Sequence, residues 1–188
     1  MSISLVGYTN AGKSTLFNAL TNAGSYAADQ LFATLDTTTR QLYIPDVGEI
    51  VLSDTVGFIT RLPHTLVESF RATLEETIQA DLLLHVVDAA SPMRDKHIAE
   101  VNKVLGEIGA ADVPQLLVMN KIDLCSSTPG IERDEYDKIT AIRLSAKTGL
   151  GINTLREVIS EAKKQFMQPQ PEPTQLTIIN NEYHPELD

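Results

Sequence analysis

The chain alternates short apolar runs, typical of strands, with segments whose apolar residues recur at helical spacing. Helices are predicted over residues 13–21 and 152–166, and a third should open at Pro92, with Ile98, Val101 and Leu105 on its inner face. Strands are predicted over residues 3–6, 40–44, 49–53, 82–87, 115–119 and 139–144. This order predicts an α/β fold of three layers around a mostly parallel, six-stranded sheet.

One edge strand of this sheet should run antiparallel, because residues 45–48 alone separate two of the strands. Residues 22–39 and 125–138 lack periodicity and are predicted to be loops. From Gln168 the sequence Gln-Pro-Gln-Pro-Glu-Pro is typical of an extended linker, and an acidic end follows. We therefore expect one domain over residues 1–167, and a Pro-rich linker with an acidic tail over residues 168–188.

A phosphate-binding pattern follows the first predicted strand and precedes the first helix. It fits G-x-x-x-x-G-K-[ST] and reads, with the next residue, Gly7-Tyr8-Thr9-Asn10-Ala11-Gly12-Lys13-Ser14-Thr15. Gly7 and Gly12 let the backbone amides turn inward, and the helix adds the positive end of its dipole. Lys13 supplies a charge to the β- and γ-phosphates, and Ser14 offers a hydroxyl to Mg²⁺. The alternative, a glycine-bearing turn that matches by chance, is disfavoured by this context.

Guanine recognition is indicated by Asn120-Lys121-Ile122-Asp123, directly after the predicted strand that ends at Met119. Guanine presents two adjacent N–H donors, at N1 and the 2-amino group, and the Asp123 carboxylate can accept from both. Asn120 can reach O6 or N7 and the phosphate-binding loop, and the Lys121 stem can cover the base. The four residues alone could form a turn at a strand end, but their place after the phosphate-binding pattern favours guanine.

The pattern Asp54-Thr55-Val56-Gly57 lies at the end of a predicted strand. Asp54 would hold Mg²⁺ through a coordinated water, since hard cations prefer oxygen ligands. The Gly57 amide can donate to the γ-phosphate, and glycine lets the peptide swing when that phosphate leaves.

The last predicted strand is followed by Ser145-Ala146-Lys147, where a loop that closes over the base is needed. The Ala146 amide can donate to guanine O6. In the GTP state a threonine should complete the coordination of Mg²⁺. The residues alone leave several candidates in the loop over residues 31–39, namely Thr34, Thr37, Thr38 and Thr39.

These motifs, in this order, resemble those of translation-factor-related GTPases, and more closely the HflX family within the Obg–HflX group. The likeness spans about residues 1–165. Three blocks carry it: Asp-Gln-Leu-Phe-Ala-Thr-Leu-Asp over residues 29–36, residues 54–59 with 62–64 and 66–70, and Ala-Asp-Leu-Leu-Leu-His-Val-Val-Asp over residues 80–88. The resemblance implies a P-loop GTPase fold.

The resemblance also assigns roles. It selects Thr34 as the magnesium-binding threonine, because the threonine after Phe-x aligns with the switch threonine of related proteins. Residues expected beside the nucleotide are then Phe32, Ala33, Thr34, Leu35 and Asp36. The groups expected to act in catalysis are Lys13, Thr34 and Gly57, and the metal ligands are Ser14, Thr34 and Asp54.

The partner implied by the resemblance is the large ribosomal subunit, with a role in rescuing or splitting stalled ribosomes. HflX-like proteins carry an N-terminal domain, implicated in ribosome binding, before the GTPase domain. Here the first strand begins at Met1, so the chain is interpreted as an isolated GTPase domain.

Hydrolysis would be an in-line attack of water on the γ-phosphorus, catalysed mostly by positioning and charge neutralisation. In Ras-like relatives a glutamine after Asp-x-x-Gly orients this water, whereas Phe58 here cannot form a hydrogen bond. Either Phe58 is withdrawn from the catalytic site and another group is supplied for catalysis, or Phe58 only packs against switch II, the segment around it. Both interpretations predict slow intrinsic hydrolysis. In several related GTPases an asparagine at the position of Asn10 helps to bind K⁺. Asn10 here either does so or only braces the loop.

Composition and charge limit the partners and the cellular location that the chain can be expected to have. The chain has 188 residues, 43% hydrophobic and 21% charged, as expected for one globular domain. Its net charge of −10 disfavours general nucleic-acid binding, and no sequence-specific DNA binding is expected. No apolar run of about 18 residues and no signal peptide occur, and Cys125 is the only cysteine, so we expect no membrane span and a cytoplasmic protein.

Two other functions stay open beside a ribosome-associated GTPase. One is a nucleotide-gated binding module with negligible turnover, an alternative that Phe58 supports. The other is the G domain of an RNA-modification or ribosome-assembly factor, which the three blocks of resemblance disfavour.

Overall fold

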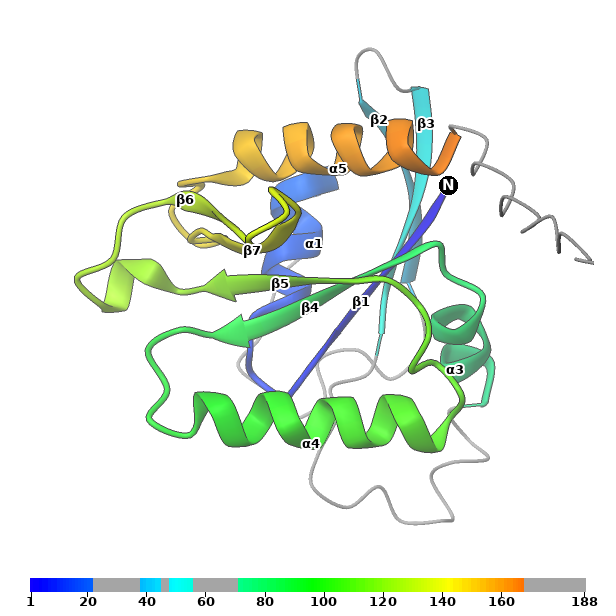
Figure 1. The fold of residues 1–188 in the computed structure, drawn as a ribbon, viewed down its shortest axis with the longest axis horizontal. Helices are drawn as coiled ribbons and strands as arrows, with labels where there is room; N and C mark the ends of the chain where they lie inside the picture. The colour runs from blue at the N-terminus through cyan, green and yellow to red at the C-terminus, as the bar shows by residue number, and fades with distance from the viewer. Residues whose placement is uncertain (22–37, 45–47, 56–70, 168–188) are drawn as a thin grey trace, which may run out of the picture.

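The protein is described by a computed structural model that covers residues 1–21, 38–44, 48–55 and 71–167 (Figure 1). Within these residues seven strands form one sheet: β1 Ser2–Gly7, β2 Thr38–Ile44, β3 Gly48–Asp54, β4 Leu82–Asp88, β5 Gln115–Asn120, β6 Gly130–Arg133 and β7 Ile139–Arg143. The helices are α1 Lys13–Thr21, α3 Arg71–Ile78, α4 Arg94–Glu107 and α5 Ile152–Met167, with a short 3₁₀ helix, η1, over Ile122–Leu124.

The strand order is β2-β3-β1-β4-β5-β7-β6, and the five central strands are parallel. The predicted α/β class and the antiparallel edge formed by β2 and β3 are confirmed. The predicted number of six strands is wrong, because β6 pairs antiparallel with β7 at the other edge. This strand lies inside the predicted loop over residues 125–138. It has only four residues, two half-buried and two exposed, so it is held largely by backbone pairing and is too short for an apolar pattern that sequence analysis could detect.

Helices cover both faces of the sheet, with α1 and α5 on one face and α3 and α4 on the other (Figure 1). Successive side chains of a strand point to opposite faces, so each strand feeds two cores. In β1, Ile3 and Leu5 join the larger core under α1 and α5, whereas Val6 joins the smaller core under α3 and α4. Burial on both faces explains why the central strands read as continuous apolar runs.

The predicted helices are found, with small shifts in two of them. Helix α1 has the predicted bounds, α5 ends one residue later, and α4 begins at Arg94, two residues after Pro92. Val101 and Leu105 of α4 are buried, as its spacing predicts. Helix α3 was not predicted. Among the described residues no helix has the length and apolar character needed to cross a membrane.

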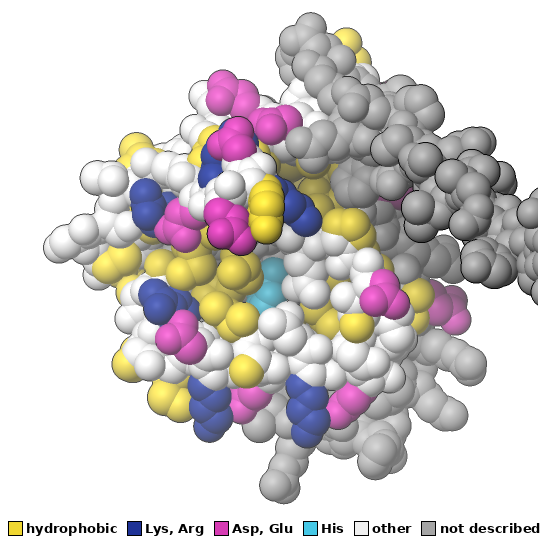
Figure 2. Space-filling model, in the orientation of Figure 1, with side chains coloured by type: hydrophobic (Ala, Val, Ile, Leu, Met, Phe, Trp, Pro, Cys, Tyr) yellow, Lys and Arg dark blue, Asp and Glu magenta, His cyan; other side chains and the backbone are white. Residues whose placement is uncertain are grey.

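Charged side chains of both signs are mixed on the face drawn in Figure 2, with no continuous basic patch among the described residues there. Along α4, Lys96 pairs with Glu100 and Lys103 with Glu107, each one helical turn apart. These pairs place charges of opposite sign side by side along the helix.

The carboxyl ends of the parallel strands meet at one edge of the sheet. There Gly7 of β1 lies beside Val86 of β4, and Asp88 of β4 lies beside Asn120 of β5. Loops that leave these strand ends are therefore close in space although they are distant in sequence. Ligands of open α/β sheets bind at such an edge.

Candidate functional site

The phosphate loop (residues 7–14) joins β1 to α1 at this edge. Gly7 passes so close to β4 that a Cβ there would collide with the carbonyl oxygen of Val86, and Gly12 has φ +100°. Asn10 also adopts left-handed backbone, with φ +60°, which asparagine tolerates better than most residues. The Ala11 amide donates to the Tyr8 carbonyl at 3.2 Å. The loop therefore has the tight curl that aims backbone amides at an anion.

Lys13 is buried at the start of α1, with 6% of its surface exposed. Its ammonium donates to the carbonyls of Gly7 and Tyr8, both at 3.1 Å, so the side chain folds back over the loop. Burial lowers the pKa of Lys13 to about 8, and the nearby Asp54 carboxylate offsets part of that effect. The site thus holds a cation whose desolvation an anionic ligand would relieve.

Ser14 and Asp54 come together as the sequence predicts. The Ser14 hydroxyl donates to Asp54 Oδ2 at 2.8 Å, and Asp54 is buried at the end of β3. Thr55, the next residue, donates to the carbonyl of Leu5 at 2.5 Å, which ties the end of β3 to β1. A hydroxyl and a carboxylate are hard oxygen donors and fit Mg²⁺, which would neutralise phosphate charge when bound. The third predicted ligand, Thr34, lies outside the described residues.

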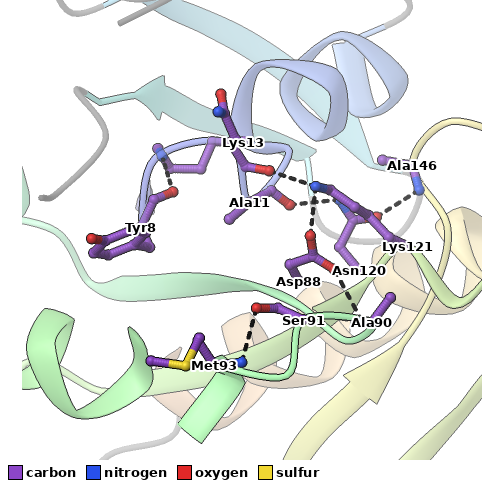
Figure 3. Close-up of polar contacts among 11 residues, drawn as sticks. Tyr8, Ala11, Lys13, Asp88, Ala90, Ser91, Met93, Asn120, Lys121 and Ala146 are labelled. Atoms are coloured by element: carbon purple, nitrogen blue, oxygen red, sulfur yellow. Dashed lines mark hydrogen bonds and ion pairs between the residues drawn. The ribbon is translucent and has the colours of Figure 1, made fainter. Parts of the chain in front are cut away.

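Asn120 joins the predicted base-recognition loops to the phosphate loop (Figure 3). Its side-chain amide donates to the Ala11 carbonyl at 3.0 Å, and its Oδ1 accepts the Ala146 amide at 2.9 Å. Asn120 is 2% exposed, so these bonds are shielded from water. The Ala146 amide, expected to donate to guanine O6, is directed to Asn120 in this structure.

Asp123 lies in η1, opposite the loop that follows β7. Its Oδ1 accepts the Ser145 hydroxyl at 2.6 Å, and the same hydroxyl accepts the Thr148 amide at 3.2 Å. Ser145 is fully buried, whereas Lys147 beside it is exposed. The Asp123 carboxylate, which is expected to recognise guanine, is therefore hydrogen-bonded to a turn that Ser145 and Thr148 stabilise.

Lys121 was expected to cover the guanine base with its stem, and in the structure its ammonium also makes two polar contacts. Its ammonium donates to the Asn10 carbonyl at 2.6 Å and to Asp88 Oδ2 at 2.7 Å. Asp88 received no role from the sequence, and an acidic residue that ends an apolar strand was the only available signal. Figure 3 shows Asp88 and Lys121 facing each other below the phosphate loop.

A cavity of about 270 Å³ lies between the phosphate loop, β4 and α4. The ring of Tyr8 stacks on that of His97 from α4, with centroids 4.0 Å apart and planes at 7°. His85 lines the cavity, and burial lowers its pKa to about 4 despite a hydrogen bond with Gln115. His85 Nδ1 has no hydrogen-bond partner among the described residues.

The predicted site residues thus divide into two groups. Those the structure brings to one edge of the sheet are Gly7, Tyr8, Thr9, Asn10, Ala11, Gly12, Lys13, Ser14, Thr15, Asp54, Thr55, Asn120, Lys121, Asp123, Ser145, Ala146 and Lys147. Those outside the described residues are Phe32, Ala33, Thr34, Leu35, Asp36, Val56 and Gly57, together with Phe58.

Comparison with known proteins gives this geometry a family. The family described as 50S ribosome-binding GTPase matches residues 2–121. GTPase HflX of Escherichia coli (strain K12) is 59% identical over 161 residues, which cover 85% of this chain and 38% of that protein. GTPase HflX of Caldanaerobacter subterraneus subsp. tengcongensis is 53% identical over 158 residues, which cover 84% of this chain and 35% of that protein. The chain therefore spans little more than a third of the length of these relatives.

Solved structures agree with this result. A GTP-binding protein from Sulfolobus solfataricus in complex with GDP is 29% identical, with a TM-score of 0.67 over 88% of this chain and 53% of that one. A variant of Era from Aquifex aeolicus has a TM-score of 0.68 at 21% identity, covers 92% of this chain and 58% of that one, and supports the fold alone. The phosphate loop, the asparagine-centred base loops and these relatives together show that the chain belongs to the 50S ribosome-binding GTPase family, as a member of the HflX type.

Proposed function

We propose that this chain binds GTP and GDP with Mg²⁺ and hydrolyses GTP, as the switch domain of a ribosome-associated GTPase. One observation carries the proposal. Asn120 bonds both the phosphate loop and the loop at Ala146, so the loop expected to bind phosphates and the loops expected to bind guanine are joined at one edge of the sheet. The names of the relatives above support the same nucleotide and the same partner.

In this proposal each group acts on one part of the nucleotide. The amides of the phosphate loop and Lys13 bind the phosphates, and the Asp123 carboxylate accepts the two N–H donors of guanine. Ser14, Asp54 and Thr34 would hold Mg²⁺, which supplies charge neutralisation when bound. The Gly57 amide would sense whether the γ-phosphate is present.

Turnover by the chain alone is expected to be slow. Hydrolysis depends on orienting a water for in-line attack, and Phe58 stands where a glutamine would do so in Ras-like proteins. A partner is then needed to complete the site, and the large ribosomal subunit is the proposed partner. K⁺ held near Asn10 is a second candidate aid, since it would add positive charge beside the phosphates.

The remaining assignments belong to the same proposal. Residues 1–167 form the GTPase domain, and residues 168–188 form a linker with an acidic tail. The proposed location is the cytoplasm, as expected for a factor that works on cytoplasmic ribosomes. No sequence-specific DNA binding is proposed, since the charge of the chain is −10.

Calorimetry on folded, nucleotide-free chain tests the nucleotide. GDP should bind far more tightly than ADP, and Asp123→Ala should lose most of that preference, by about tenfold or more for each hydrogen bond to the carboxylate. Asp95→Ala, which removes a surface carboxylate of α4, is the matched control and should keep it. Equal binding of GDP and ADP by the unmodified chain would refute the proposal.

Phosphate release with and without large ribosomal subunits tests the partner and the turnover. We expect slow release alone and faster release with subunits. No release in either condition would favour a nucleotide-gated binding module. GTP-dependent dimerisation would favour an RNA-modification or assembly factor.

A further inference from the structure

Asp88 is the last residue of β4 and lies beside Asn120 of β5. Its two carboxylate oxygens have different partners. Oδ1 accepts the Ala90 amide at 3.0 Å, which closes a turn after the strand, and Oδ2 accepts the Lys121 ammonium at 2.7 Å. Figure 3 shows the carboxylate between these two donors. One oxygen therefore shapes the local turn, and the other reaches the loop that follows β5.

The Lys121 ammonium has a second acceptor, the carbonyl of Asn10 at 2.6 Å. Both residues joined by this bond have left-handed backbone, with φ +66° at Lys121 and +60° at Asn10. That conformation is unfavourable for lysine and less so for asparagine, so surrounding contacts help to maintain it. The ammonium is the contact that ties these two residues together.

The Lys121 side chain is long and has many rotamers, so the ammonium needs an anchor. The side chains of Lys121 and Asp88 are 28% and 25% exposed, which means that water screens the pair only in part. A carboxylate at hydrogen-bond distance confines the ammonium to the place from which it can donate to Asn10.

We propose that Asp88 is a positioning residue for nucleotide binding: it holds Lys121 against the Asn10 carbonyl and so keeps the phosphate loop in the shape that receives phosphates. This inference rests on the proposed function, because it concerns the same site. The direction of the amides that follow Asn10 depends on the backbone angles of Asn10, which the Lys121 bond restrains.

Charge and positioning predict opposite effects for the same substitution. Asp88 is an anion close to a site for a polyanion, so charge alone would make Asp88→Asn bind nucleotides more tightly. Loss of positioning would instead loosen the phosphate loop and speed nucleotide release. A role limited to the turn would leave release unchanged, because asparagine keeps an oxygen for the Ala90 amide.

The experiment follows release of a fluorescent GDP analogue, and of a fluorescent non-hydrolysable GTP analogue, from the full chain into excess unlabelled GDP. We expect Asp88→Asn to release both about tenfold faster, the size of one hydrogen bond to a charged group. The preference for GDP over ADP should stay unchanged, because Asp123 is intact. Asp95→Ala, whose carboxylate pairs with Arg94 on the surface of α4, is the matched control and should release at the unmodified rate.

The variant Lys121→Gln and its combination with Asp88→Asn complete the design. If Asp88 acts through Lys121, the double variant releases nucleotide no faster than Lys121→Gln alone. Release from Asp88→Asn at or below the unmodified rate, or additive effects in the double variant, overturns the proposal. If circular dichroism shows that Asp88→Asn does not fold, Asp88→Ser decides, because serine also keeps an oxygen for the Ala90 amide but cannot hold the Lys121 ammonium by charge: faster release supports the proposal, and an unmodified rate overturns it. An unmodified chain without GDP preference refutes the proposed function instead, whatever the variants do.

Discussion

The side-chain amide of Asn120 donates to the backbone carbonyl of Ala11 at 3.0 Å, a contact between residues 109 positions apart in the chain. It passes directly beside Gly12, where a Cβ would collide with Asn120 Nδ2. The absence of a side chain at Gly12 is therefore what lets the phosphate end and the base end of the cleft share one hydrogen bond.

Gly12→Ala should accordingly weaken GDP binding in addition to straining the backbone. Gly109 also has positive φ, +83°, but open space surrounds its Cβ position, so Gly109→Ala is a matched control for strain alone. We expect each variant to lose about 1 kcal/mol of unfolding free energy from strain. Gly12→Ala alone should weaken GDP binding, by about tenfold or more, because its Cβ also displaces the Asn120 amide. Equal GDP affinity of the two variants in calorimetry would show that the contact does not matter for binding.

Lys13 predicts a pH dependence of binding. In the free protein the pKa of Lys13 is about 8, so its ammonium is mostly protonated below that pH. Above that pH the free protein loses the proton, whereas a bound polyphosphate favours the charged form. The dissociation constant of GDP should therefore rise between about pH 8 and about pH 9, and its slope should approach about tenfold per pH unit above the pKa of Lys13.

Lys13→Arg is the control for this titration, because a guanidinium stays charged throughout that range. The variant is expected to bind GDP more weakly, since the geometry differs, but with an affinity that does not change over the same pH interval. Parallel pH profiles for the unmodified chain and Lys13→Arg would remove Lys13 as the titrating group.

His85 predicts a pH dependence of stability. Its pKa falls from 6.5 when exposed to about 4 in the folded state, so the unfolded chain binds more protons between these values. Stability from this group is complete above pH 6.5 and decreases as the pH falls toward 4. The loss is roughly 3 kcal/mol, since one pKa unit corresponds to about 1.4 kcal/mol.

The measurement compares urea unfolding of the unmodified chain and of His85→Leu across that interval. Carboxylates contribute to both proteins alike, so the difference between their unfolding free energies isolates His85. The unmodified chain should lose stability more steeply on acidification. Identical slopes would show that His85 protonates freely in the folded protein.

Asn10 predicts a dependence on the monovalent cation. Its carbonyl bonds Lys121, whereas the residue itself is exposed at the rim of the phosphate loop. If the Asn10 side chain helps to bind K⁺, phosphate release should be faster in KCl than in NaCl, and Asn10→Ala should abolish the difference. The ratio of the two rates is the readout, because alanine tolerates the φ of +60° less well and changes the absolute rates. Asn102→Ala, on the surface of α4, is the control; equal rates in both salts for the unmodified chain would exclude the K⁺ hypothesis.

Much of the fold could be read from the sequence because its signals are local. Continuous apolar runs mark strands that are buried on both faces, and they place β1, β4 and β5 within a residue or two of their observed ends. The bounds of α1 follow from apolar spacing after the glycine-rich loop. By contrast, β6 has four residues, of which two are exposed, and it pairs with β7 through the backbone, so it is too short to leave a pattern in the sequence.

The sequence by itself determined which residues carry the chemistry, because phosphate and guanine each demand particular groups at fixed spacing: glycines and a lysine before a helix, and a carboxylate three residues after an asparagine. Only the tertiary structure decided how those groups are held. Three features depend on which strands lie side by side: the hydrogen bond from Asn120 to Ala11, the ion pair of Asp88 with Lys121, and the His85 Nδ1, which has no hydrogen-bond partner among the described residues. Strand order is set by packing across the whole sheet, so no local pattern of residues encodes these contacts.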